Sequence, residues 1–129
     1  GLMGTAQFTK LNVIDDYVID QGTSGIWTYR KWNSGNKECW GSQTFSNVNI
    51  NTAFGGTFYS GNFGNINFPS GLFTQTPKVF VDVLEGTYGC WLMRGSDHPS
   101  AAQTGSQNAV RGTAVNIPSV TLAYYAVGR

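Results

Sequence analysis

The feature that most constrains the fold of this chain is an alternation of apolar and polar side chains with a period of two residues. In the segment from Lys78 to Leu84 the apolar residues Val79, Val81 and Val83 occupy every second position. The segment from Ile26 to Asn33 is rich in aromatic and β-branched side chains. A period of two places alternate side chains on opposite faces of a strand. The pattern therefore predicts an all-β protein.

Turn signals interrupt the alternation at intervals of about 8–12 residues, the spacing found in a sandwich or a small barrel. We expect a short edge strand at Asp16–Asp20 and further strands at Ile26–Asn33, Lys37–Phe45, Val48–Phe54, Phe58–Phe68, Lys78–Leu84, Gly89–Arg94 and Ser119–Val127. A long polar loop is expected from Gly95 to Asn108. Thr5–Asp15, where Phe8, Leu11 and Ile14 lie three apart, is either a helical turn or, as we favour, an extended lead-in.

Ser34 and Gly35 lie between two expected strands and supply the backbone freedom of a tight hairpin. A two-residue turn there would pair Lys31 with Glu38 and Tyr29 with Trp40. One face of this hairpin would then carry Trp27, Tyr29, Lys31, Glu38 and Trp40, and the other would carry Thr28, Arg30, Trp32, Lys37 and Cys39. Because neither face is purely polar, we expect the hairpin either to lie centrally in a sandwich or to face another subunit.

The chain has 129 residues, enough for one domain with a substantial core. We expect residues 1–22 to form a lead-in or neck and residues 23–129 to form the head domain. The formal net charge is only +1, which argues against a nucleic-acid partner. No segment approaches the roughly 18 consecutive apolar residues that span a membrane, so no membrane insertion is expected. The sequence begins with Gly1 and not with Met, as expected of a trimmed chain or a piece of a longer one.

Catalytic and cofactor motifs are weak in this sequence. The single histidine, His98, follows Asp97, but residues adjacent in the chain rarely point at each other and no nucleophile motif accompanies them. Histidines and cysteines do not cluster at metal-ligand spacing, and the glycines do not form a phosphate-binding motif. We therefore expect no metal, no cofactor and no enzymatic activity. The two cysteines, Cys39 and Cys90, are expected to be buried thiols, although a disulfide would be possible if their strands were adjacent.

Recognition of a polar, uncharged ligand suits the composition better, because aromatics make up 14% of the chain and charged residues only 12%. Aromatic faces that stack on a sugar, with polar groups nearby, follow the general design of a small-molecule site. The candidate ligand-binding residues, at strand ends and in the long loop, are Tyr59, Trp91, Arg94, Asp97 and His98. The alternative for each aromatic residue is packing in the core or between subunits, and Arg94 could simply pair with Asp97.

Three segments carry a resemblance to a known family. DYVIDQGTSGIWTYRKWNSGNKECWG (Asp16–Gly41) closely resembles a segment near the C-terminus of minor structural and tail-fibre proteins of phages and prophages of Gram-positive bacteria, with Asp20 where glutamate is usual. NINFPSGLFTQTPKVFVDVL (Asn65–Leu84) is similar to an element of phage tail-fibre C-terminal domains and of H-type lectins. SVTLAYYAVGR (Ser119–Arg129) is similar to the closing strand of the same domains.

The resemblance implies a receptor-binding head: a compact antiparallel β-sandwich, assembled as a homotrimer at the tip of a tail fibre. Its partners would be the rest of the fibre or baseplate and a saccharide of the host cell surface. Such a protein folds in the bacterial cytoplasm and acts outside the cell as part of the virion. No catalytic residue is implied. Two alternatives stay open: a trimerisation cap that touches no receptor, and a depolymerase that cuts the saccharide.

Overall fold

The computed structural model describes residues 16–129. In these residues eight strands form and no helix does, so the expected all-β, antiparallel class is confirmed. The strands are β1 (Val18–Ser24), β2 (Trp27–Trp32), β3 (Lys37–Phe54), β4 (Thr57–Ser60), β5 (Lys78–Gly86), β6 (Trp91–Arg94), β7 (Gln107–Arg111) and β8 (Val115–Gly128). The turns between them use glycine where the backbone requires it: Gly25 and Gly55 have φ values of 59° and 60° at the first central position of two-residue hairpin loops.

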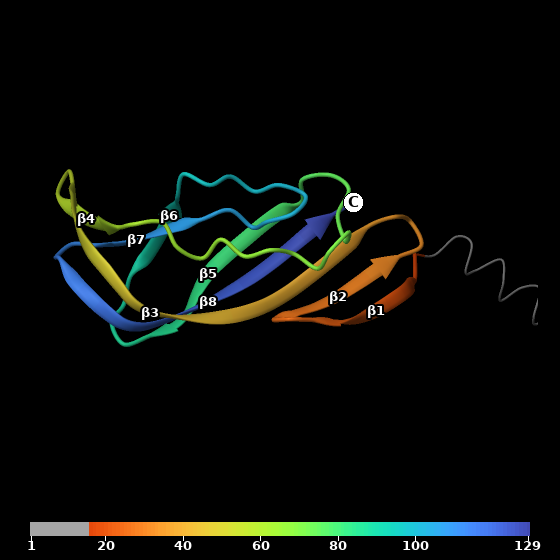
Figure 1. Ribbon diagram of the computed structural model, residues 1–129, viewed down its shortest axis with the longest axis horizontal. Coiled ribbons are helices and arrows are strands. Elements are labelled where there is room, and N and C mark those ends of the chain that lie inside the picture. Colours follow the sequence, from red (N-terminus) through yellow and green to blue (C-terminus); the bar gives the residue numbers. More distant parts are fainter. Residues whose placement is uncertain (1–15) are drawn as a thin grey trace, which may run out of the picture.

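All strand pairs are antiparallel and belong to one hydrogen-bonded sheet. The path β1-β2-β3-β4-β7-β6 runs through the sheet, and β8 pairs with both β3 and β5. β3 and β8 are long enough to run through most of the molecule side by side (Figure 1). One end of β3 therefore lies in a layer with β1, β2, β8 and β5, while its other end leads through β4 into β7 and β6.

On both β3 and β8, the side of the strand that is buried switches at the same point along the pair. On β3 the partly buried Phe45 is followed by the buried Val48 and Ile50, a step of three residues instead of two. At this step Asn47 has a φ of 55°, and the opposite residue on β8 is Pro118, which lacks the N–H of a ladder bond. The two strands thus bend together, which lets the sheet fold back over its own core.

The core lies between the layer β1-β2-β3-β8-β5 and a covering layer made of β4, β7, β6 and the irregular segments 61–77 and 95–106. Trp27 of the first layer packs against Phe68 of the cover, with 5.5 Å between ring centroids, and against Tyr124 of its own layer, with 5.9 Å between ring centroids. Phe73 packs edge-on against Phe68 at 5.0 Å. The side of each layer that faces this core is called the inner face below, and the opposite side the outer face.

The register predicted for the β2–β3 hairpin is wrong by one residue. Gly35, at a φ of 94°, ends a three-residue loop in which the Trp32 N–H donates to the Asn36 carbonyl and the Gly35 N–H to the Trp32 carbonyl. This loop needs a positive φ only at a glycine, whereas a two-residue type I′ turn would also place Ser34 at positive φ. Arg30 consequently pairs with Glu38, and Tyr29 with Cys39.

The corrected register also reassigns the faces of the hairpin. Trp27, Tyr29 and Cys39 share the inner face, and Arg30, Glu38 and Trp40 share the outer face. The expected pairing of Lys31 with Glu38 is replaced by an ion pair between Lys31 and Asp20, with 3.6 Å between Nζ and Oδ2. Bulky side chains on both faces of β2, the basis for expecting a second subunit, remain a feature of the molecule.

Several predicted segments have different bounds. The edge strand expected at Asp16–Asp20 is β1, Val18–Ser24, and the strands expected at Lys37–Phe45 and Val48–Phe54 are one strand, β3. Phe58–Phe68 is a strand only to Ser60, and the loop expected to Asn108 ends at β7. Thr5–Asp15 and most of the expected neck, residues 1–22, lie outside the described residues. Cys39 and Cys90 are free thiols, of which Cys39 is buried and Cys90 half-buried.

Candidate functional site

Two of the predicted ligand residues lie on one face of the covering layer. Tyr59 on β4 and Trp91 on β6 both pair with Val110 of β7, so their side chains lie in one row on the outer face. Trp91 is 55% exposed, and the half-buried Tyr59 contacts Phe54 edge-on with 5.6 Å between ring centroids. Two strand spacings separate the two residues, about 9–10 Å. We call Tyr59, Val110 and Trp91 the aromatic row.

The other three predicted residues lie beyond the end of β6 and do not join the aromatic row. Arg94 pairs with Gln107 and therefore belongs to the opposite face of β6 from Trp91. The ion pairs formed within residues 16–129 join Arg30 to Glu38 and Lys31 to Asp20, so the possible pairing of Arg94 with Asp97 is not formed. Asp97 and His98 are exposed, and their hydrogen bonds are made by the backbone: their carbonyls accept from Ser106 N and Gln103 Nε2, and the Asp97 N–H donates to Ser106 Oγ.

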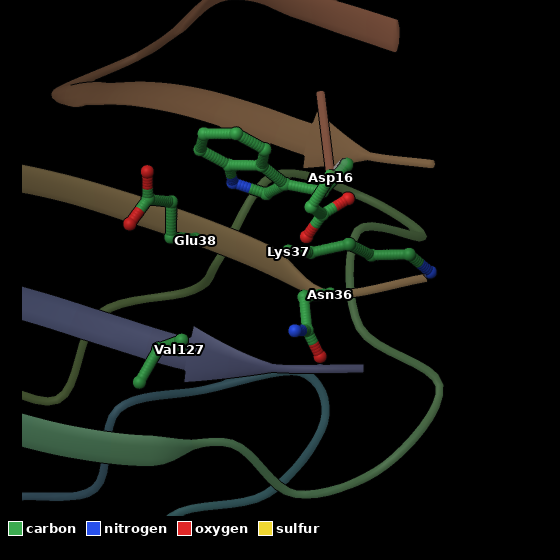
Figure 2. A pocket seen from close by; sticks show the side chains of 6 residues that line it. Asp16, Asn36, Lys37, Glu38 and Val127 are labelled. Carbon is green, nitrogen blue, oxygen red and sulfur yellow. The ribbon is translucent and has the colours of Figure 1, made fainter. Parts of the chain in front are cut away.

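A small hollow, which we call the hairpin pocket, lies where the β2–β3 hairpin meets the end of β8. Its volume is about 200 Å³, and it combines an indole ring with carboxylate, amide and ammonium groups. The residues that line it are Asp16, Trp32, Asn36, Lys37, Glu38 and Val127. Figure 2 shows Glu38 and Val127 on neighbouring strands, with Asn36 at the end of the hairpin. An aromatic wall beside a few polar groups is the general make-up of a small-molecule site.

Hydrogen bonds fix the shape of the hairpin pocket. The carboxylate of Asp16 accepts from the backbone N–H of Ser34 at 3.2 Å and from its hydroxyl at 2.8 Å. Asn33 bonds to the backbone of Tyr17 through both its N–H and its side-chain oxygen, at 2.9 and 3.0 Å. The segment that leads into β1 is thereby held against the hairpin loop, so the loop carries a preformed wall of the pocket.

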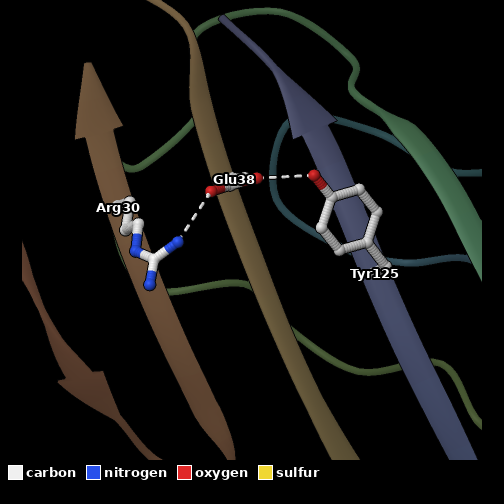
Figure 3. Close-up of polar contacts among 3 residues, drawn as sticks. All are labelled: Arg30, Glu38 and Tyr125. Atoms are coloured by element: carbon white, nitrogen blue, oxygen red, sulfur yellow. Dashed lines mark hydrogen bonds and ion pairs between the residues drawn. The ribbon is translucent and has the colours of Figure 1, made fainter. Parts of the chain in front are cut away.

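Glu38 connects the hairpin pocket to the rest of the outer face. Tyr125 of β8 donates its hydroxyl to Glu38 Oε2 at 2.5 Å, and Arg30 of β2 lies 3.7 Å from Glu38 Oε1 (Figure 3). The Arg30 guanidinium also lies over the Trp40 ring, 5.0 Å from its centroid. Only 16% of the Glu38 side chain is exposed, so these partners take the place of water. The hydrogen bond to Glu38, followed by partial burial, raises the pKa of Tyr125 to about 12.

The thiols of the described residues are poorly suited to nucleophilic chemistry. Burial, with a smaller contribution from the charge of Glu38, raises the pKa of Cys39 to about 12. Burial also raises the pKa of Cys90, against an opposing effect of Arg111. A thiol whose pKa is raised stays protonated at neutral pH and is a weak nucleophile. Among residues 16–129 there is no group of three or more His, Cys, Asp or Glu side chains that could hold a metal ion.

The hairpin pocket was not predicted from the sequence, because the register predicted for β2 and β3 is wrong by one residue. With Arg30 paired to Glu38, the residues Trp32 and Glu38 share the outer face near the hairpin end. The predicted register placed them on opposite faces, where they could not line one hollow. The signal that could have found the pocket is Gly35 followed by Asn36, which suits a three-residue hairpin loop with glycine at the positive-φ position.

No membrane-spanning helix is found in residues 16–129, which form no helix at all.

No protein-family model matches the chain, and no curated protein matches it. Among solved structures it is similar to the N-truncated R2-type pyocin tail fibre, with 15% identity and a TM-score of 0.46 over 98% of this chain. The chain spans 42% of that protein. It is also similar to the N-truncated R1-type pyocin tail fibre, with 14% identity and a TM-score of 0.47 over 96% of each chain. Both of these solved proteins are tail fibres, the class of protein that the sequence motifs resemble.

Proposed function

We propose that this chain is the receptor-binding head of a phage or prophage tail fibre, that it assembles as a homotrimer, and that it binds a saccharide of the host cell surface without cutting it. The observation that carries the proposal is the place of the Asp16–Gly41 segment, whose sequence most closely resembles tail-fibre proteins of Gram-positive phages. This segment forms β1, β2 and the start of β3, and it supplies five of the six residues that line the hairpin pocket.

The proposed trimer contact is the outer face of β5 and the adjoining part of β8, so that the hairpin pocket at the end of the β2–β3 hairpin stays open to a ligand. Phe80 and Leu84 on β5 are 61% and 63% exposed, and Tyr125 is 38% exposed beside Phe80, with 6.4 Å between their ring centroids. Exposed apolar side chains gathered on one face mark an interaction surface. The charge of Glu38, on β3 beside this face, is already balanced by Arg30. A second copy could therefore cover the Arg30–Glu38 pair without leaving either charge unpaired, whereas Asp82, between Phe80 and Leu84 on the same face of β5, would need a cationic partner from the other copy or a place at the rim of the contact.

The proposed ligand sites are the hairpin pocket and the aromatic row, where Tyr59 and Trp91 offer ring faces to a sugar. The absence of catalysis is supported by the state of the two carboxylates in the hairpin pocket. Asp16 accepts two hydrogen bonds from Ser34, and Glu38 is bound by Tyr125 and Arg30. A glycoside hydrolase needs one carboxyl group to deliver a proton and a second to act as nucleophile or base. Both groups here hold the fold of the hairpin.

Adsorption competition tests the proposal. The purified head should block attachment of the parent phage to its host, and Trp91→Ala together with Trp32→Ala should abolish this effect while the far-UV spectrum and the mass of the assembly stay unchanged. Thr113→Ala, on an exposed turn, serves as the matched control. A head that retains no host saccharide and leaves adsorption unchanged would support the trimerisation cap. New reducing ends released from host wall polymer would support the depolymerase.

Native mass spectrometry at micromolar concentration tests the assembly separately. The expected species contains three chains. Phe80→Ser with Leu84→Ser should shift the population to single chains, because it removes the exposed apolar side chains of the proposed contact. A wild-type chain that is monomeric at these concentrations would refute the homotrimer.

A further inference from the structure

One edge of β3 has no strand partner over much of its length. β8 pairs with β3 from Lys37 to Ile50 along one edge. On the other edge, β2 pairs only as far as Trp40 and β4 begins only at Ile50. Within the described residues, the backbone N–H and C=O groups between these points therefore lack a ladder partner on that edge. Such groups are ready to bind a partner that brings donors and acceptors of its own.

Two hollows lie beside this open edge. One is between residues 45–49 of β3 and residues 60–63, and the other is lined by Gln43 of β3, the β1–β2 turn at residues 24–27 and residues 65–69. Their volumes are about 290 and 380 Å³. We call them together the edge groove. No Asp, Glu, Lys, Arg or His lines either hollow. Their most frequent polar side chains are carboxamides, contributed by Gln43, Asn47, Asn49, Asn62, Asn65 and Asn67.

The groove also has an aromatic wall. Phe45 and Phe63 line one hollow and contact each other edge-on, with 5.4 Å between ring centroids. Phe45 comes from β3 and Phe63 from the opposite segment, so the two rings join the walls at the base of the groove. Aromatic surface beside several uncharged donors and acceptors is suited to a ligand with both C–H faces and hydroxyl groups.

The wall opposite β3 is held in place by hydrogen bonds. The Trp27 indole N–H donates to the Asn67 carbonyl at 2.7 Å, and the Gly105 N–H donates to Asn65 Oδ1 at 3.0 Å. Asn62 Oδ1 accepts from Ser96 N and from Asn108 Nδ2, both at 3.2 Å. These contacts fix the groove before any ligand arrives, so little ordering would oppose binding.

Asn47 lines the groove with its backbone in the left-handed region, at a φ of 55°. It is the only residue other than glycine with a positive φ among residues 16–129. A non-glycine residue in this conformation stores strain, and such residues cluster at ligand-binding sites. Glycine would make the same bend without strain. The presence of asparagine is explained if its carboxamide is needed in the groove.

From these observations we infer that the edge groove is a binding site for a neutral oligosaccharide. The inference rests on the proposed function for the ligand class, but it assigns a site distinct from the hairpin pocket and the aromatic row. From Gln43 to Asn49 the edge extends about 20 Å, room for a chain of several sugars. An added peptide strand fits less well, because the bend at Asn47 breaks the regular repeat of backbone groups that strand pairing requires.

Nuclear magnetic resonance of the ¹⁵N-labelled chain tests the site. The probes are neutral tetrasaccharides of N-acetylglucosamine, glucose and galactose, beside sialylated and uronate-containing ones. A neutral probe should shift the backbone amides of residues 43–49 and 60–69 and leave Trp91 unchanged, and the charged probes should bind at least tenfold more weakly. Asn47→Gly combined with Gln43→Ala should weaken binding about tenfold, the effect of losing one or two hydrogen bonds.

Asn51→Ala combined with Asn116→Ala is the matched control, since both residues are exposed and neither lines the groove. If no neutral probe shifts the groove amides, or if shifts occur only at the aromatic row or the hairpin pocket, the groove site is refuted while the proposed function stands. Shifts of the groove amides that follow protein concentration and not sugar would assign the edge to a second copy, and would also refute it. A head that fails to block adsorption refutes the proposed function independently of these shifts.

Discussion

The hydrogen bond from Tyr125 to Glu38 makes a prediction that can be worked out in magnitude. Replacing Tyr125 by Phe removes the hydroxyl that donates to Glu38 Oε2 at 2.5 Å and leaves the ring in place. A hydrogen bond to a charged group contributes about 1.5–3 kcal/mol to stability. Because Tyr125 is 38% exposed, water can replace part of this bond. We expect Tyr125→Phe to lower the free energy of unfolding by about 1 kcal/mol.

Urea denaturation followed by tryptophan fluorescence measures this change, at two protein concentrations because the stability of an oligomer depends on concentration. Tyr88→Phe is the control, since Tyr88 is similarly exposed, at 45%, and its ring centroid lies 5.7 Å from Arg111 Cζ. A double-mutant cycle with Glu38→Gln isolates the pair. The reasoning is refuted if Tyr125→Phe is no more destabilising than Tyr88→Phe, or if the two substitutions at positions 38 and 125 are additive.

The same bond predicts a dependence on alkaline pH. The pKa of Tyr125 is about 12 in the folded chain, above its ordinary value of 10.0. A raised pKa means that the folded state holds the proton more tightly, so the stabilisation is complete below pH 10 and is lost as the pH rises toward 12. Tyrosinate absorbance should therefore show a phenol that ionises near pH 12 and is lost in Tyr125→Phe, while the buried Tyr124, whose pKa burial raises further, still ionises later in both proteins.

Three further predictions concern packing and reactivity. Gly41→Ala should prevent stable folding, because the added Cβ would collide with the backbone carbonyl of Ile26, whereas Gly61→Ala should change the denaturation midpoint little, since nothing lies within 4 Å of the added carbon. Leu122→Ala, at a fully buried position, should cost about 2–5 kcal/mol of unfolding free energy in the same urea assay, and a loss below 1 kcal/mol would contradict the assigned core. Labelling with a thiol reagent at pH 8 should modify Cys90 before Cys39, and rapid labelling of Cys39 in native protein would contradict its burial.

The strands whose side chains alternate cleanly could be predicted from the sequence. Val79, Val81 and Val83 pack against the core from one face of β5, as their spacing predicts. β7 could not be found in this way, because Gln107, Asn108, Ala109 and Val110 are all buried and show no alternation. Asn108 is buried because its carboxamide bonds within the fold, where Nδ2 donates to the Ser60 carbonyl at 2.7 Å, while Gln107 donates through Nε2 to the Gly105 carbonyl at 3.3 Å and leaves its buried Oε1 without a partner. Local sequence does not reveal partners that lie almost fifty residues away.

The candidate sites were predictable only in part. Tyr59 and Trp91 do share a face, but this depends on both strands meeting Val110, which their own sequences do not specify. The hairpin pocket depends on a register that one residue of the loop decides. The edge groove depends on where β2 stops and β4 starts beside β3. Each site is therefore a property of strand neighbours, and residue type alone could indicate only the kind of chemistry.

The paired change at Asn47 and Pro118 has a consequence for how such a chain can vary. On each side of this point the core-facing residues of both strands occupy every second position, but the positions beyond it are shifted by one residue relative to those before it. Deleting a single residue on one strand would leave the extra step on the other strand alone, so that two residues of that strand would oppose one residue across the corner and the bend would no longer be shared. Length changes here can survive only as matched events on both strands, so this corner should stay constant in length while the exposed loops around it grow and shrink.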